Sequence, residues 1–133
     1  MQYVEAFNAL GYDVPNPRQD WSAEKAGGVC ITLWKSEVQW VPTPPHLDLW
    51  AKAGPGTTDW ETLPGHKKRT GHLARAVSEF DGWVDVIIVT GTPGKGYGNA
   101  DPWLPEKRAN HGWRIQKFDK TTGFFSVVAE KLK

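Results

Sequence analysis

Apolar residues recur at helical spacing in two segments of the chain. Near the start, residues 3–11 place Val4, Phe7 and Leu10 three positions apart, and Gly11 is a typical residue after a helix end. In the middle, residues 67–80 carry an apolar stripe made of Leu73, Ala76, Val77 and Phe80. A neighbouring polar stripe on the same segment consists of Lys68, His72, Arg75 and Glu79. We predict a helix in each segment.

Other segments have the pattern of strands. Residues 29–34 alternate between two faces, and residues 83–90 form a nearly continuous apolar run, which is typical of a central strand covered on both sides. Residues 113–119 and 124–131 alternate around a hairpin turn at 120–123. A weaker alternation in residues 35–41 is compatible with a further strand or a bulged continuation of the first one.

Two long stretches rich in proline and glycine separate these elements. Residues 42–66 contain Pro42, Pro44 and Pro45, with one or two helical turns expected at 46–52, and residues 91–112 form the second stretch. Connections of this length inside one domain are often binding loops.

Together the elements indicate an α+β fold in a single domain spanning residues 1–133. The strands are grouped towards both ends of the chain, and two or three helices accompany four to six strands. We expect a strongly curved mixed or antiparallel sheet, or a small open barrel, with the helices packed on it.

Composition and charge restrict the cellular environment that we expect for the protein, but they do not indicate an activity. The chain has 133 residues and a formal net charge of +1, so there is no global basic field. Its one cysteine, Cys30, cannot form an internal disulfide and falls in a predicted strand. The first residues do not resemble a signal peptide, and no apolar run is long enough to span a membrane. We therefore expect a soluble, cytoplasmic protein.

Tryptophan is the unusual component. Eight tryptophans are more than a core of this size needs, and indole N–H groups favour partly exposed positions, so several should line a cleft or surface. They are Trp21, Trp34, Trp40, Trp50, Trp60, Trp83, Trp103 and Trp113. Trp21 stands beside Arg18, Asp20 and Ser22 in a loop that Pro15 and Pro17 make rigid.

Two basic clusters suggest phosphate contacts near these rings. The first, on and before the central helix, contains Lys67, Lys68, Arg69, His72 and Arg75. The second lies in the second long loop and after it, and contains Lys107, Arg108, His111 and Arg114. Contacts to the phosphate backbone that position the nucleic acid, beside a pocket that selects the base, are typical of proteins that recognise an unpaired or flipped base.

Several motifs of enzymes are absent. Gly91–Gly98 has the wrong spacing for a phosphate-binding loop, since only two residues separate Gly91 from Gly94-Lys95 and a glycine follows the lysine. No nucleophile elbow, paired-cysteine motif or His-Glu-x-x-His motif occurs. A metal site would have to be assembled from distant residues such as Asp48, Asp101 and Glu106.

The order Asn16-Pro17-Arg18-x-x-Trp21-Ser22-Ala23, followed by Gly28–Trp34, resembles a motif in small bacterial and phage-borne domains found with restriction-type nucleases. The later order of helix, apolar strand, long loop and closing hairpin is similar to the PUA-like group, which includes the EVE, YTH and SRA readers of modified bases. The resemblance implies a curved sheet or barrel with an aromatic pocket for a modified or flipped base. It makes Arg18, Trp21 and Trp34 pocket candidates.

The leading hypothesis is a non-enzymatic nucleic-acid-binding module without a cofactor or metal, which reads a modified or flipped base in DNA rather than RNA. A nuclease is its candidate partner. Arg18, Asp20 and Ser22 would contact the base edge, and Trp21 would stack with Trp34 or Trp40. Lys68, Arg69, His72 and Arg75 would bind phosphates. The alternatives are a small metal-dependent hydrolase or nuclease, with Asp101 and His111 in its site, and a phage or bacterial inhibitor module whose tryptophans anchor a protein partner.

Overall fold

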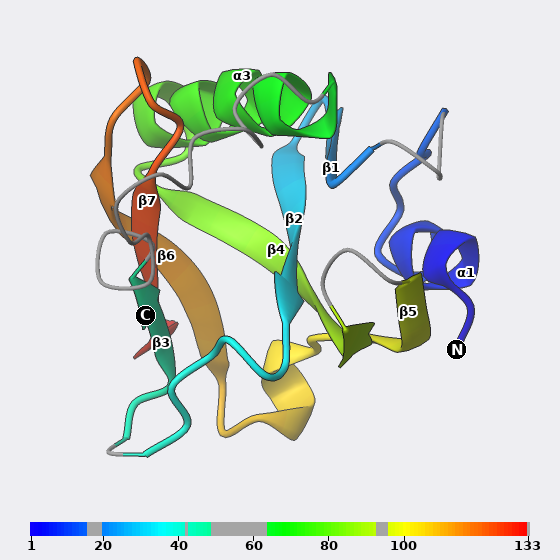
Figure 1. The fold of residues 1–133 in the computed structure, drawn as a ribbon. Coiled ribbons are helices and arrows are strands. Elements are labelled where there is room, and N and C mark those ends of the chain that lie inside the picture. Colours follow the sequence, from blue (N-terminus) through cyan, green and yellow to red (C-terminus); the bar gives the residue numbers. More distant parts are fainter. Residues whose placement is uncertain (16–19, 42, 49–63, 93–95, 133) are drawn as a thin grey trace.

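The computed structural model of the chain describes residues 1–15, 20–41, 43–48, 64–92 and 96–132 (Figure 1). Its α-helices are α1 (Tyr3–Ala9) and α3 (Pro64–Glu79), and a 3₁₀ turn, η2, covers Pro105–Lys107. The strands are β1 (Ser22–Lys25), β2 (Gly28–Trp34), β3 (His46–Asp48), β4 (Trp83–Thr92), β5 (Gly96–Pro102), β6 (His111–Phe118) and β7 (Phe125–Lys131). No helix in the described ranges is both long and apolar enough to cross a membrane.

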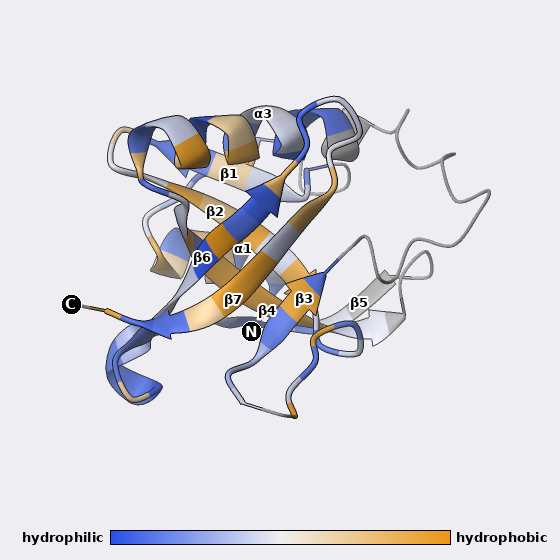
Figure 2. Ribbon diagram, turned by 90° about the vertical axis from the view of Figure 1, so that its left-hand side faces the viewer, coloured by the Kyte–Doolittle hydropathy of each residue, from blue (hydrophilic) through white to orange (hydrophobic). Residues whose placement is uncertain are grey.

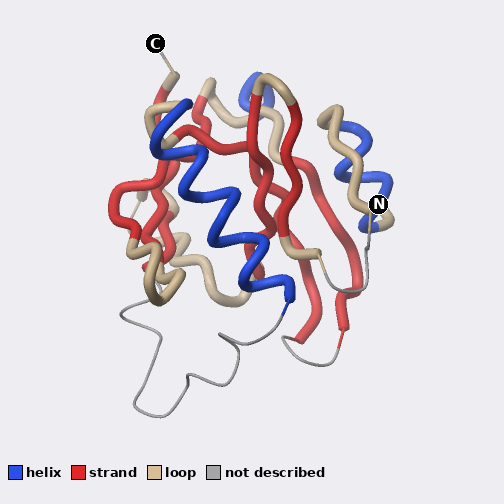
Figure 3. The backbone as a smooth tube through the Cα atoms, turned by 90° about the horizontal axis from the view of Figure 1, so that it is seen from above, coloured by secondary structure: helices blue, strands red, loops and turns tan. Residues whose placement is uncertain are grey.

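The strands form one seven-stranded mixed sheet in the order β1-β2-β4-β6-β7-β3, with β5 added beside β4. The β2–β4 pair is parallel, and the other strand pairs are antiparallel. A parallel pair needs a crossover, and the chain between β2 and β4 contains α3, which lies across one face of the sheet (Figure 3). The β1 strand is therefore an edge strand that α3 covers on one side.

The α+β class and the mixed sheet are confirmed, but the expected strong curvature is wrong. The sheet is open and not strongly curled. Closing it would require the end strands β1 and β3 to pair, and they do not pair in the described structure.

The central helix packs with the predicted stripe only in part. Leu73 and Ala76 are fully buried and Phe80 is partly buried, as expected, whereas Val77 is 44% exposed. Val77 lies at the edge of the stripe, about 100° around the helix from Ala76, whereas Phe80, further along the chain, still packs against the core.

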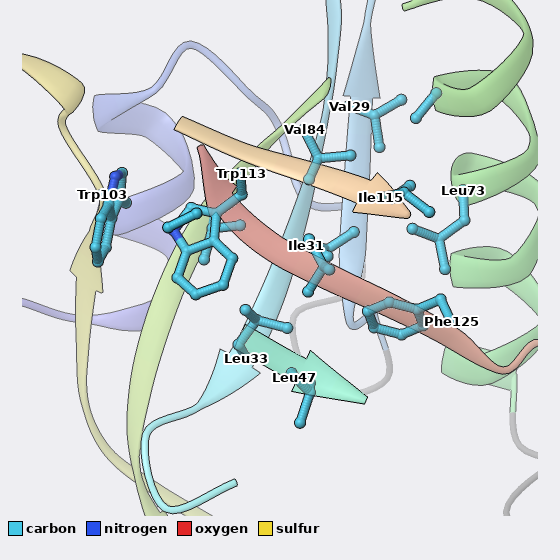
Figure 4. Close-up of a cluster of buried hydrophobic side chains, with 14 of the residues drawn as sticks. Val29, Ile31, Leu33, Leu47, Leu73, Val84, Trp103, Trp113, Ile115 and Phe125 are labelled. Atoms are coloured by element: carbon cyan, nitrogen blue, oxygen red, sulfur yellow. The ribbon is translucent and has the colours of Figure 1, made fainter. Parts of the chain in front are cut away.

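Two core clusters lie on opposite faces of the sheet. On the α3 face, Val84, Val86 and Ile88 of β4 join a cluster built around Trp113 and Phe125 (Figure 4). On the other face, Ile87 and Val89 join a cluster with Phe7 of α1. The β4 strand is thus covered on both sides along its middle, as its apolar run predicted. Figure 2 colours the apolar residues in the middle of the sheet orange.

Several sequence predictions about strands need correction. Residues 22–25, expected as loop, form β1 because Ser22–Lys25 pair with Gly28–Ile31 in a tight hairpin. The expected strand at 35–41 is instead a turn with a single bridge between Gln39 and His46.

The helical turn expected at 46–52 is replaced at its start by β3, which pairs with β7. Residues 96–102, expected as loop, form β5 beside β4.

Candidate nucleic-acid interface

The polar stripe of α3 lies against strand β1 and the residues just before it. This arrangement brings together seven polar or charged side chains and one indole, from two segments that are more than forty positions apart in the chain. We call it the β1–α3 face; its members are Asp20, Trp21, Ser22, Glu24, Lys68, Arg69, His72 and Arg75.

Asp20 and Lys68 form the first contact of this face. The Lys68 ammonium lies 2.9 Å from a carboxylate oxygen of Asp20, whose side chain is only 3% exposed, whereas that of Lys68 is 49% exposed. The backbone carbonyl of Asp20 also accepts a hydrogen bond from the Tyr3 hydroxyl at 2.6 Å. Asp20 is therefore buried as a counter-charge and is not presented to a ligand.

His72 links Ser22 to Glu24. The Ser22 hydroxyl lies 2.6 Å from Nδ1 of His72, and a Glu24 carboxylate oxygen lies 2.9 Å from Nε2. Burial lowers the pKa of His72, and this effect outweighs the nearby Glu24 carboxylate, which acts in the opposite direction. The imidazole is then neutral at pH 7, with Ser22 donating to Nδ1 and the Nε2–H donating to Glu24.

This Ser22–His72–Glu24 chain has the residue types of a hydrolytic triad, but Ser22 is only 1% exposed. A nucleophilic serine must reach its substrate, and the ring nitrogens are used in the opposite sense from that of a serine protease, where the serine bonds Nε2 and the carboxylate Nδ1. The Ser22–His72–Glu24 chain therefore fixes α3 to β1, with Ser22 buried at one end and Glu24 exposed at the other.

Arg75 completes the connection at the β1–β2 turn. Its guanidinium pairs with Glu24 at 3.0 Å and with Glu79 one helical turn later. It also donates to the backbone carbonyls of Lys25 at 2.9 Å and Ala26 at 3.1 Å. Most of its donors are thus engaged within the protein.

Arg69 and Trp21 form the aromatic part of the face. The guanidinium carbon of Arg69 lies 5.0 Å from the Trp21 ring centroid and 5.1 Å from that of Phe125, a core residue. Burial lowers the pKa of Arg69 to about 10, so the group remains charged at neutral pH. Trp21 itself is half-buried.

The other predicted stacking residues lie elsewhere. Trp34 packs against the cluster that contains α1, on the sheet face opposite α3, so it does not lie opposite Trp21 across a pocket. Trp40 packs against the α3-side core and donates its indole N–H to the Lys35 carbonyl at 3.0 Å. Arg18, Trp50 and Trp60 lie outside the described residues. The structure thus unites Asp20, Trp21 and Ser22 with Lys68, Arg69, His72 and Arg75, but separates Trp34 and Trp40 from them.

A scan of known family models and searches of curated proteins and of solved structures found no match to this chain.

Asp101 and His111, the residues of the enzymatic alternative, both lie next to Arg108. Among the described residues, no group of three or more His, Cys, Asp or Glu side chains lies close enough to hold a metal ion. Cys30 is fully buried, and burial raises the pKa of its thiol, which keeps the thiol protonated and unreactive.

Sequence reasoning missed Glu24 as the link between His72 and Arg75. Glu24 lies in a four-residue hairpin strand, and the sequence pattern predicted a loop there. The second basic cluster is also divided: Arg114 pairs with Asp81 at 2.7 Å and lies over the Trp83 ring, whereas Arg108 lies over the Trp103 ring.

Proposed function

We propose that this protein is a nucleic-acid-binding module whose contact surface is the β1–α3 face. The observation that carries the proposal is the packing of a cationic helix against a half-buried indole. The basic cluster of α3 and a tryptophan from a distant part of the sequence meet at one edge of the sheet. A row of cations beside an aromatic ring is the combination that single-stranded or flipped nucleotides require.

The start of α3 supplies the phosphate contacts in this proposal. Lys67 is exposed and Lys68 is half exposed, and the first turn of the helix contains no acidic residue. Acidic residues are normally favoured at this position because the helix N-terminus carries partial positive charge. Two lysines here instead add to that charge, and the resulting potential favours a phosphate group.

Trp21 supplies the stacking face, supported by Arg69. The contact between the guanidinium and the indole orients the ring and keeps a cation beside it. Because Trp34 lies on the opposite face, the proposal uses one aromatic partner for a base and not a two-sided sandwich. Asp20 and Ser22 then act as positioning residues, since both are buried in contacts with α3.

The finer parts of the proposal come from the sequence resemblance. A PUA-like relationship favours a modified or flipped base in DNA as the ligand and a nuclease as a functional partner. The open sheet does not form the barrel expected from this resemblance, so the stacking site is placed on the edge strand β1 and helix α3.

Binding of fluorescently labelled oligonucleotides, followed by anisotropy, tests the proposal. The set contains single-stranded and duplex DNA with cytosine, 5-methylcytosine, 5-hydroxymethylcytosine or N6-methyladenine, and matching RNA. We expect saturable binding, with Trp21→Ala weakening it by about 1–3 kcal/mol, the usual contribution of one base–aromatic stack.

Trp34→Phe is the control, because it alters a partly buried indole on the opposite face. Circular dichroism of both variants confirms that they fold. Equal binding by wild type and folded Trp21→Ala would remove Trp21 from the site, and no binding to any oligonucleotide would contradict the proposed function.

A further inference from the structure

A groove is lined by residues next to η2 and by the ends of β6 and β7. Figure 1 places η2 and β3 towards the end of the sheet away from α3. We call this groove the Trp103 groove. It has a volume of about 800 Å³, which is within the range of small-molecule sites. The lining residues on which the argument depends are Pro44, Pro45, Trp103, Arg108, His111 and Lys131.

Three segments distant in sequence build the walls, and hydrogen bonds fix each of them. The Pro45 carbonyl accepts a hydrogen bond from the Ala129 amide at 2.9 Å, which holds the proline wall against β7. The Trp103 indole donates to the His111 carbonyl at 2.7 Å, which ties the loop before η2 to the start of β6. The groove is therefore preformed rather than a gap between loose loops.

The basic side chains converge on one part of this groove. His111 and Lys131 are direct cross-strand partners at the end of the β6–β7 ladder, so their side chains lie on the same face. Arg108 adds a planar guanidinium whose carbon lies 4.4 Å from the Trp103 ring centroid. The His111 Nδ1 lies 3.2 Å from the Arg108 carbonyl and 3.0 Å from the Ala109 carbonyl, which ties the start of β6 to the turn that carries Arg108.

Arg108 is oriented for anion binding. The ring of Trp103 supports one face of the guanidinium, and Asp101 lies 3.6 Å from one of its nitrogens, with both charged side chains well exposed. A supported, exposed guanidinium offers paired N–H donors in the geometry that phosphate and carboxylate oxygens accept. On the other side, Pro44 and Pro45 offer flat apolar surface.

We propose that the Trp103 groove binds a nucleoside phosphate, with the phosphate on Arg108 and Lys131 and the base against the proline wall. The shared chemistry is one phosphate next to one flat ring, from a free mononucleotide or from the phosphorylated end of a strand. The proposal does not rest on the proposed function, because the groove shares no residue with the β1–α3 face.

Isothermal titration calorimetry with the four nucleoside 5′-monophosphates tests this assignment. Adenosine and inorganic phosphate serve as half-ligands, and a dinucleotide with and without a 5′-phosphate tests the strand end. We expect saturable binding of at least one monophosphate, and weaker binding of both half-ligands. Tighter binding of the phosphorylated dinucleotide than of the free monophosphate would identify a strand end as the source.

Arg108→Gln and Lys131→Gln should each weaken binding about tenfold or more, since each removes a charge-assisted contact with the phosphate. Lys107→Gln is the matched control, because Lys107 is an exposed neighbour of Arg108 that does not line the groove. Arg108→Lys provides a second variant that keeps the charge but loses the planar fork. The indole N–H signal of Trp103 in NMR spectra should shift on titration and report the location.

Three results would overturn the proposal. They are the absence of saturable binding for every monophosphate, inorganic phosphate binding as tightly as the nucleotides, and Lys107→Gln weakening binding as much as Arg108→Gln. Binding of oligonucleotides at the β1–α3 face is measured with different variants, so failure of one proposal is distinguishable from failure of the other.

Discussion

The β1–α3 face and the Trp103 groove both place cations beside an aromatic ring, but they differ in where the opposing charges lie. On the β1–α3 face, Lys68 pairs with a buried carboxylate and Arg75 pairs with two carboxylates and two backbone carbonyls. In the groove, Lys131 stands opposite His111, and among the described residues the ion pair of Arg108 is the longer contact with exposed Asp101.

This difference assigns two roles to the same residue types: stabilising the fold and binding a ligand. Cations that pair with the buried carboxylate of Asp20 or with several partners at once hold α3 on the sheet, so their removal should cost stability. Exposed cations without a buried counter-charge contribute little to stability and remain available to a ligand. Residue composition alone gave both clusters the same interpretation, and only the partners distinguish them.

The largest effect on stability should come from Arg69→Ala. It removes the contacts of a buried guanidinium with the rings of Trp21 and Phe125 and leaves a cavity beside the core. We expect the free energy of unfolding to fall by about 2–4 kcal/mol in urea denaturation. Lys67→Ala, two positions earlier and exposed, should change it by less than about 0.5 kcal/mol. Equal losses would contradict the structural role of Arg69.

Asp20→Asn should have the next largest effect. The substitution keeps the shape of the side chain but removes the charge that pairs with Lys68 in a buried position. We expect a loss of about 1–3 kcal/mol in the same assay, from one hydrogen bond to a charged group. Glu79→Gln is the matched control, since it makes the same change in a 55% exposed ion pair and should cost under about 0.5 kcal/mol. If the two variants are equally stable, the Asp20–Lys68 pair does not anchor α3.

Stability should also depend on pH through His72. The pKa of His72 is lower in the folded protein than in the unfolded chain, where a histidine has a pKa of about 6.5. In the interval between those two pKa values the unfolded state binds more protons, so the free energy of unfolding falls as pH decreases through it. His72→Gln should reduce this slope, measured by urea denaturation across that interval, and an unchanged slope would exclude His72 as its source.

The smallest effect should come from Lys131→Gln in the groove. Because Lys131 is opposite His111 and not opposite an acid, we expect a change of less than about 0.5 kcal/mol in the free energy of unfolding. The same substitution at Lys68 leaves Asp20 buried without its counter-charge and should cost more. Equal losses at both positions would remove the distinction between the two regions.

Local patterns in the sequence predicted the central part of the fold. The apolar run of residues 83–90 correctly indicated a strand covered on both faces, and the stripe containing Leu73 and Ala76 correctly indicated the helix packed on it. The hairpin at residues 120–123 was also predicted by its turn residues.

The short strands were not predictable in this way. β1 and β3 have four and three residues, too few for an alternating pattern, and they depend on pairing with β2 and β7. This limit also applies to the site: the basic residues of α3 were recognised, but their burial against Asp20, Ser22 and Glu24 follows from the position of β1. The stacking of Trp21 with Trp34 was inferred from sequence proximity, whereas the strand between them places their contacts on opposite faces of the sheet.

The salt dependence of oligonucleotide binding tests the central claim most directly. The account predicts that affinity falls as salt rises, and that Lys67→Gln reduces the slope of log affinity against log salt by about 0.7–0.9, the effect of one lost phosphate contact. Lys35→Gln, an exposed lysine after β2, should leave the slope unchanged. Identical slopes for wild type and Lys67→Gln, or no binding even at low salt, would contradict the assignment of the β1–α3 face as a nucleic-acid interface.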